Sequence, residues 1–140
     1  MQVVVMKQKS VYILFTDTGT LFSKMIRLYT KKPLNHASIA LNAELTELYS
    51  FGRKQPNNPF RAGFVKETLY GNLIRNGRKT LCALYRCDVP LPVYKRILKT
   101  IREMEQNQDD YQYNLIGLLG VMLNRSLGSD KSYFCSQFVA

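Results

Sequence analysis

Apolar residues in the first half of the chain follow the patterns expected of β-strands. The run Val11–Phe15 is continuously apolar, which predicts a short strand buried on both faces. Two further runs, 34–41 and 46–51, flank a tight connection at 42–44. Short strand-like runs joined by so few residues predict an antiparallel hairpin.

The strand predicted at 34–41 places polar and small residues on one side. Because successive side chains of a strand point to opposite faces, His36, Ser38 and Ala40 share one face. The small side chains beside His36 are expected to leave room for a substrate.

Helical spacing of apolar residues dominates elsewhere. It predicts a helix over 20–29 that ends before Pro33, another from about 93 to 107, and another near 114–123. The intervening segment 52–79 contains clusters of proline, glycine and asparagine, and we expect a long loop there.

Composition favours one globular domain, and the predicted strands and helices indicate the α+β class, with an antiparallel sheet packed against helices. The chain has 140 residues, of which 46% are hydrophobic and 21% charged. No signal peptide is evident at the N-terminus, and the apolar run 115–123 is too short for a transmembrane segment. We therefore expect a cytoplasmic protein, with a peripheral membrane contact as an alternative.

Charge is the unusual part of the composition. There are 20 Lys and Arg residues against 10 Asp and Glu, a formal net charge of +10. Such an excess raises encounter rates with anionic partners. The basic residues are dispersed, and no helix-turn-helix, zinc-finger or RNA-stacking motif accompanies them. The sequence thus predicts a basic surface that could contact an anionic partner, rather than a specific nucleic-acid site.

Cysteine usage argues against a metal or disulfide framework. Cys82 and Cys87 lie in a predicted strand at 81–89, where their spacing places them on opposite faces. We expect both to be buried thiols in a reducing compartment. With one histidine and no CxxC pair in the chain, a zinc site is not expected.

The remaining cysteine, Cys135, has surroundings suited to a nucleophile. The segment 128–132 has loop and N-cap composition, and the apolar run from Tyr133 predicts a helix that begins close to the cysteine. A helix N-terminus favours the thiolate, and its backbone N–H groups can support an oxyanion. His36 would accept the thiol proton. The alternative is a structural pair, a buried thiol and a hydrogen-bonded strand histidine.

The order of these parts resembles a known family. The strand, turn and helix at 12–28, the motif Asn35–Ile39 and the final motif Tyr133–Val139 resemble the circularly permuted papain-like cysteine hydrolases of the NlpC type, especially their YiiX-like branch, which is related to the lecithin retinol acyltransferase-like group. The resemblance covers most of the chain and depends on short motifs in a His-first, Cys-last order.

The resemblance implies a permuted papain-like core in which Cys135 attacks a carbonyl carbon and His36 relays the proton. It also implies a polar group on the next strand that orients the imidazole, for which this chain offers Glu47 and Ser50 on opposite faces. Glu47 has the better chemistry, since a carboxylate stabilises an imidazolium, while Ser50 fits the strand phase better. An exposed strand carboxylate is the structural alternative for Glu47.

The expected reaction is hydrolysis or acyl transfer at amide or ester bonds through a thioester, without a cofactor. Cell-wall peptides and lipid acyl groups are the substrate classes that the resemblance implies. The alternative functions are a non-catalytic papain-like binding module with a basic face, and a small nucleic-acid-binding protein. Because the chain stops five residues after Cys135, we also expect the domain to be truncated at its C-terminal end.

Overall fold

The structure is a computed structural model and describes residues 6–17, 31, 33–55, 58–70, 79–113, 132–133 and 138–140. The helices predicted at 20–29 and 114–123 lie outside these residues, as does Cys135 with its predicted helix start.

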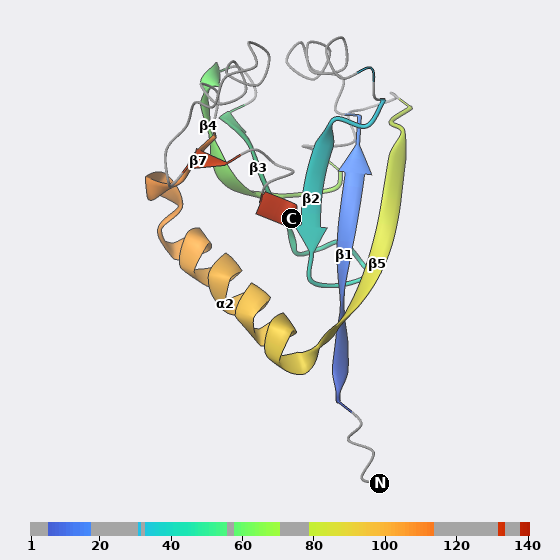
Figure 1. Ribbon diagram of the computed structural model, residues 1–140. Helices are drawn as coiled ribbons and strands as arrows, with labels where there is room; N and C mark the ends of the chain where they lie inside the picture. The colour runs from blue at the N-terminus through green and yellow to red at the C-terminus, as the bar shows by residue number, and fades with distance from the viewer. Residues whose placement is uncertain are drawn as a thin grey trace, which may run out of the picture.

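The described strands form one sheet in the order β5-β1-β2-β3-β4-β6-β7 (Figure 1). All neighbours from β5 to β4 are antiparallel, and a helix covers one face, so the α+β class is confirmed. The strands are β1 (Gln8–Thr16), β2 (His36–Ala40), β3 (Leu48–Gln55), β4 (Asn58–Glu67), β5 (Cys82–Pro90), β6 (Gln112–Tyr113) and β7 (Ser132–Tyr133).

The predicted strands at the N-terminal end are confirmed. β1 lies between β2 and β5 and buries Val11, Leu14 and Thr16. The hairpin of β2 and β3 has the antiparallel register Ile39↔Tyr49 and Ala40↔Leu48.

The long loop predicted at 52–79 is wrong over much of its length. β3 extends to Gln55, and β4 pairs with it along the register Phe51↔Phe64 and Gly52↔Gly63. The glycines obscure the alternation in the sequence, but Phe51 and Phe64 are both fully buried and hold this strand pair on the core. In the structure β3 ends at Gln55 and β4 begins at Asn58.

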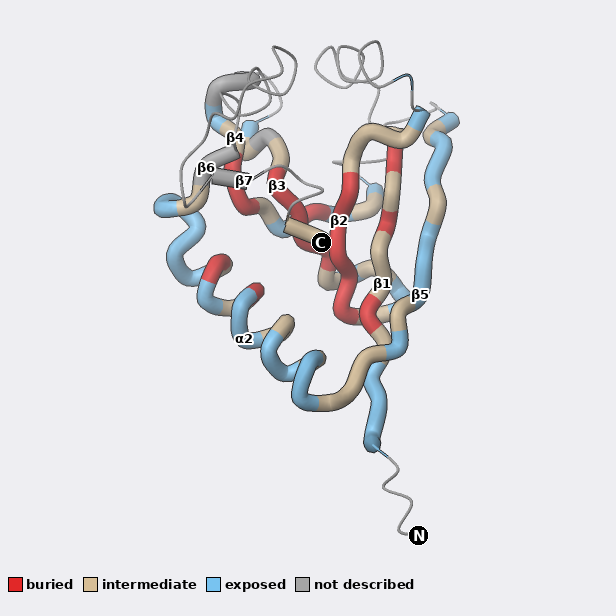
Figure 2. The backbone as a smooth tube through the Cα atoms, in the orientation of Figure 1, coloured by how far each residue is buried: buried red, intermediate tan, exposed pale blue. Residues whose placement is uncertain are grey.

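Helix α2 (Leu91–Gln106) packs its apolar stripe against the sheet. Pro92 stands in its first turn, where no backbone N–H is required. Ile101 and Met104 are buried in a core with residues of β1, β2, β3 and β4, and the C-terminal Phe138 and Val139 pack against the same cluster. Figure 2 shows the buried residues of α2 on the side that faces the strands.

The opposite face of the sheet has a smaller apolar cluster of Leu14, Ala40 and Leu48. The two faces therefore differ in character: aromatic and aliphatic side chains fill the α2 side, whereas polar side chains of β2, β3 and β4 share the other side with this cluster.

The two strand cysteines lie on opposite faces of β5, as predicted. Cys87 packs against the core beneath α2, and Cys82 pairs with Thr16. The expected burial of Cys82 is wrong, because this side chain is exposed. Within the described part of the chain β5 pairs with β1 alone, so it is an edge strand with a neighbour on one side only.

Candidate functional site

The site lies on the sheet face opposite α2 and is assembled by strand register. β1 pairs with β2 as Thr16↔His36 and Leu14↔Ser38, so these four side chains share that face. On the other side of β2, a side chain at Gly52 would lie 3.6 Å from His36 Cε1. His36 is thus flanked by a threonine on one neighbouring strand and a glycine on the other.

A carboxylate from a more distant strand holds the imidazole. His36 Nε2 lies 2.8 Å from Glu67 Oε1, and only 12% and 6% of the two side chains are exposed. Glu67 closes β4 and is paired in register with Leu48 of β3. Its side chain therefore crosses β3 to reach a histidine on β2.

Small side chains on β3 make this crossing possible. Ser50 and Gly52 occupy the face between Glu67 and His36, and a Cβ added at Gly52 would lie 3.6 Å from Ser50 Oγ and 3.8 Å from Glu67 Oε1. Larger residues at these two positions would fill the path of the Glu67 side chain.

The surroundings of Glu67 favour its ionised form. Burial by itself raises the pKa of this carboxyl, but the charge of His36 and hydrogen bonds from His36 and Ser38 outweigh burial, so the pKa lies below its usual value. Ser38 Oγ donates to Glu67 Oε2 over 2.6 Å. Ser50 Oγ is buried beside the carboxylate and also lowers its pKa, although it forms no hydrogen bond of ordinary geometry with the described residues.

The Glu67 contact determines the chemistry available at His36. An ionised carboxylate accepts from Nε2–H, and in the neutral imidazole this leaves the lone pair on Nδ1. His36 can therefore take up a proton at Nδ1 while Glu67 stabilises the resulting imidazolium. A histidine held in this way is suited to general base catalysis.

Thr16 carries an unusual hydroxyl beside His36. Its Oγ1 is buried and has no hydrogen-bond partner among the described residues, and the residue is only 1% exposed. A buried hydroxyl without a partner costs free energy, while valine has nearly the same shape. We expect Thr16→Val to raise the free energy of unfolding by about 1 kcal/mol. Urea denaturation would measure this, and a loss of stability would show that the hydroxyl has a partner in solution.

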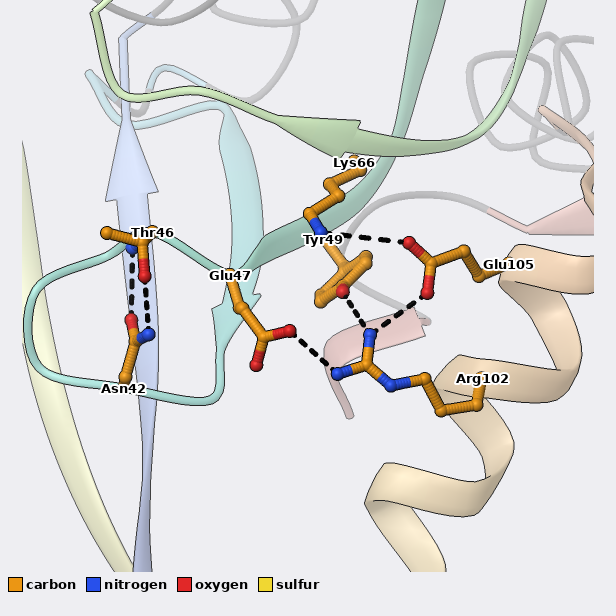
Figure 3. Close-up of polar contacts among 7 residues, drawn as sticks. All are labelled: Asn42, Thr46, Glu47, Tyr49, Lys66, Arg102 and Glu105. Atoms are coloured by element: carbon orange, nitrogen blue, oxygen red, sulfur yellow. Dashed lines mark hydrogen bonds and ion pairs between the residues drawn. The ribbon is translucent and has the colours of Figure 1, made fainter.

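The structure places Glu47 away from His36, on the α2 side of the sheet (Figure 3). Its Oε1 accepts a hydrogen bond from Arg102 Nη2 over 2.7 Å. Arg102 also donates to the hydroxyl of Tyr49 and to Glu105. Figure 3 shows this network joining the start of β3 to α2. In this setting Glu47 connects the sheet to the helix, and among the described carboxylates Glu67 is the one that contacts His36.

Ser50 lies within the site, beside Glu67 rather than bonded to His36. Cys135 lies outside the described residues, so its distance from His36 is not defined by the structure.

Sequence reasoning missed Glu67 because the segment around it was expected to be a loop. The available signal was the alternation in 60–67, where Phe60, Ala62 and Phe64 occupy every second position and Glu67 closes the run. Read as a strand after the Pro56–Pro59 turn residues, this pattern would have brought a carboxylate next to the predicted hairpin.

Comparisons of the chain with models of protein families, with curated proteins and with solved structures gave no match. Within the described ranges, no group of three or more His, Cys, Asp and Glu side chains is arranged to hold a metal ion. No helix in the described part of the chain is long and apolar enough to cross a bilayer.

Proposed function

We propose that the chain is a cysteine hydrolase or acyltransferase with a permuted papain-like arrangement, in which Cys135 is the nucleophile and His36 its base. The buried His36–Glu67 pair carries this proposal. Glu67 fills the place of the orienting polar group that the family resemblance requires, on β4 instead of β3. The substrate would contain an amide or ester carbonyl.

The proposed reaction needs only the side chains of this chain and water. His36 Nδ1 accepts the proton of the Cys135 thiol, and Sγ bonds to the carbonyl carbon. The C–N or C–O bond then breaks as the leaving group takes the proton from His36, which leaves a thioester. Water next gives a proton to His36, its oxygen bonds to the same carbon, and the thiol is released as the C–S bond breaks. An acceptor hydroxyl or amine in place of water would make the reaction an acyl transfer.

Two described segments flank Cys135 in the chain: Tyr133 of β7, which pairs with Tyr113 at one edge of the sheet, and Phe138. Phe138 packs on Phe51 with ring centroids 5.4 Å apart. Both rings belong to the core on the α2 side of the sheet, whereas the His36 ring lies near Gly52 on the opposite face. Cys135 precedes Phe138 by three peptide units, a length of chain that spans at most about 11 Å, so the proposed contact requires the thiol to reach past the sheet edge or end to the face that carries His36.

Thiol labelling against pH tests the pair directly. We expect iodoacetamide to modify Cys135 rapidly well below pH 8, since a histidine partner depresses the pKa of a thiol. His36→Ala should slow labelling at pH 6 by about 100-fold, because an isolated thiol has a pKa near ~8.5. Cys82 and Cys87 are replaced by alanine in all variants, as Cys82 is exposed and would react.

Equal labelling rates in the parent and His36→Ala proteins, each with the pH dependence of an ordinary thiol, would contradict the catalytic pair. The chain would then be better described as a papain-like binding module. Unfolded protein provides the reference rate for an unperturbed thiol.

A further inference from the structure

The end of the molecule opposite His36 joins the start of β1 to the start of α2. The backbone N–H of Leu91 donates to the carbonyl of Lys7 over 2.8 Å, and Gln8 pairs with Pro90. Figure 1 shows the first turn of α2 beside this end of β1 and β5.

Both segments that meet here lack acidic residues. There is no Asp or Glu in residues 1–16 or in residues 89–102. Lys9 shares a strand face with Val11, which is buried beneath α2, so it lies on the α2 side of the sheet, and Lys7 directly precedes β1. The exposed basic residues of these two segments form what we call the basic end surface: Lys7, Lys9, Lys95, Arg96 and Lys99.

The charges of this surface are largely uncompensated. Lys99 lies 3.7 Å from Glu103, an exposed pair that contributes little. Among the described residues, no carboxylate forms an ion pair with the other four members. By contrast, Lys54, Arg86 and Arg102 each have an acidic partner elsewhere in the structure. This end of the fold therefore has four exposed cations, Lys7, Lys9, Lys95 and Arg96, whose charge no ion pair of the described residues offsets.

Exposed apolar side chains accompany these cations. Met6 is 61% exposed and precedes Lys7, while Val93 is 38% exposed in the first turn of α2. Cations that surround apolar side chains suit the interface of an anionic bilayer, where phosphates meet the cations and the apolar groups enter the acyl boundary.

We propose that the basic end surface docks the protein on bilayers that contain anionic phospholipid. The proposal goes beyond the proposed chemistry and does not depend on it, since it uses no residue of the His36 site. A nucleic acid is the less favoured partner, because the exposed side chains among these cations are aliphatic, whereas single strands are bound by aromatic stacking and duplexes by groove-fitting elements.

Vesicle co-sedimentation tests the surface with matched variants of the full chain. Vesicles of phosphatidylcholine alone should bind little, and vesicles with equal parts of phosphatidylglycerol should bind well. Lys95→Gln/Arg96→Gln/Lys99→Gln should weaken binding to the anionic vesicles by about 100-fold, since each basic residue near such a surface contributes about fivefold. The control Lys31→Gln/Arg61→Gln/Lys79→Gln removes the same charge from exposed positions elsewhere and should weaken binding only a few-fold.

A second variant separates a bilayer from a soluble polyanion. Met6→Ser/Val93→Ser should weaken vesicle binding and leave binding to heparin unchanged. Equal losses of vesicle affinity in the two triple variants would show that net charge alone explains the binding, and would overturn the proposal. Tighter binding to a short RNA or DNA duplex than to anionic vesicles, lost in the α2 triple variant, would overturn it in favour of nucleic acid. Failure of the His36 labelling test would leave all these outcomes unaffected.

Discussion

Replacement of Glu67 by glutamine is expected to reduce hydrolytic turnover by about 10⁴-fold, the loss found when the carboxylate of a catalytic triad is replaced by its amide. Glutamine keeps the length of the side chain but cannot neutralise an imidazolium. Its amide NH₂ can also donate to Nε2, which would favour the proton on Nδ1 and remove the lone pair that must accept the thiol proton. His36 Nε2 and Glu67 Oε1 lie 2.8 Å apart and both side chains are largely buried, so the substitution acts directly on this hydrogen bond.

Glu47→Gln is the matched control for this variant. Glu47 was the carboxylate favoured from the sequence, and the structure joins it to Arg102 on α2. Turnover of an activated thioester or ester substrate, with the pH dependence of kcat/KM, should distinguish the two changes. We expect Glu67→Gln to alter the pH profile as well as the rate, and Glu47→Gln to change neither appreciably. Loss of activity in Glu47→Gln with normal activity in Glu67→Gln would reverse the assignment.

The ionisation of Glu67 should make the free energy of unfolding depend on pH in the acid range. The pKa of Glu67 is lower in the folded protein than its ordinary value of 4.5, so its ionisation stabilises the fold. This contribution is fully present above about pH 4.5 and is lost as the pH falls through the folded pKa. We expect urea midpoints to fall more steeply below that pH in the parent than in Glu67→Gln. Parallel decreases in the two proteins would show that other groups control acid unfolding.

Local patterns in the sequence predicted the hairpin of β2 and β3 and the face that carries His36. These features depend on alternation over a few residues, which burial of one sheet face imposes directly. The amphipathic pattern also predicted α2, which begins and ends within two residues of the expected bounds.

Local alternation could have placed Glu67 on a strand next to the hairpin, but its contact with His36 arises from pairing between strands. Its side chain reaches His36 only because β4 pairs with β3 and because Ser50 and Gly52 are small. The glycines at 52 and 63 weaken the strand pattern, yet they are the reason that backbone and side chains approach closely here. Gly52 lies beside the His36–Glu67 contact, and Gly63 allows the close approach of β4 to the backbone of Tyr111.

The basic end surface and the candidate site lie at opposite ends of β1. Lys9 and Thr16, the neighbour of His36, are seven residues apart on this strand, roughly 23 Å at ~3.3 Å per residue. A protein docked by the basic end surface would thus hold His36 away from the bilayer. Of the two substrate classes, docking in this orientation favours a soluble peptide amide over an acyl chain of the same membrane.

Replacement of Gly63 by alanine is expected to destabilise the protein by about 3 kcal/mol, the upper part of the range for overpacking. A Cβ at this position would lie 2.3 Å from the carbonyl oxygen of Tyr111, a backbone atom that cannot rotate away. Relief requires β4 and the chain before β6 to separate, at the point where Gly63 pairs with Gln112. Gly63 has no positive φ, so the penalty comes from this contact and not from backbone strain.

Gly52→Ala provides the control, since Gly52 is the cross-strand partner of Gly63. A Cβ at Gly52 would meet its nearest neighbours at 3.6 to 3.8 Å, which is ordinary van der Waals contact. Alanine also loses less chain entropy on folding than glycine does, so this variant should be neutral or more stable by up to about 1 kcal/mol. Urea midpoints of the two variants should therefore move in opposite directions or differ widely. If both glycines tolerate alanine equally, β6 does not hold its place against β4 in solution, and the support that this edge gives to the strand carrying Glu67 is absent.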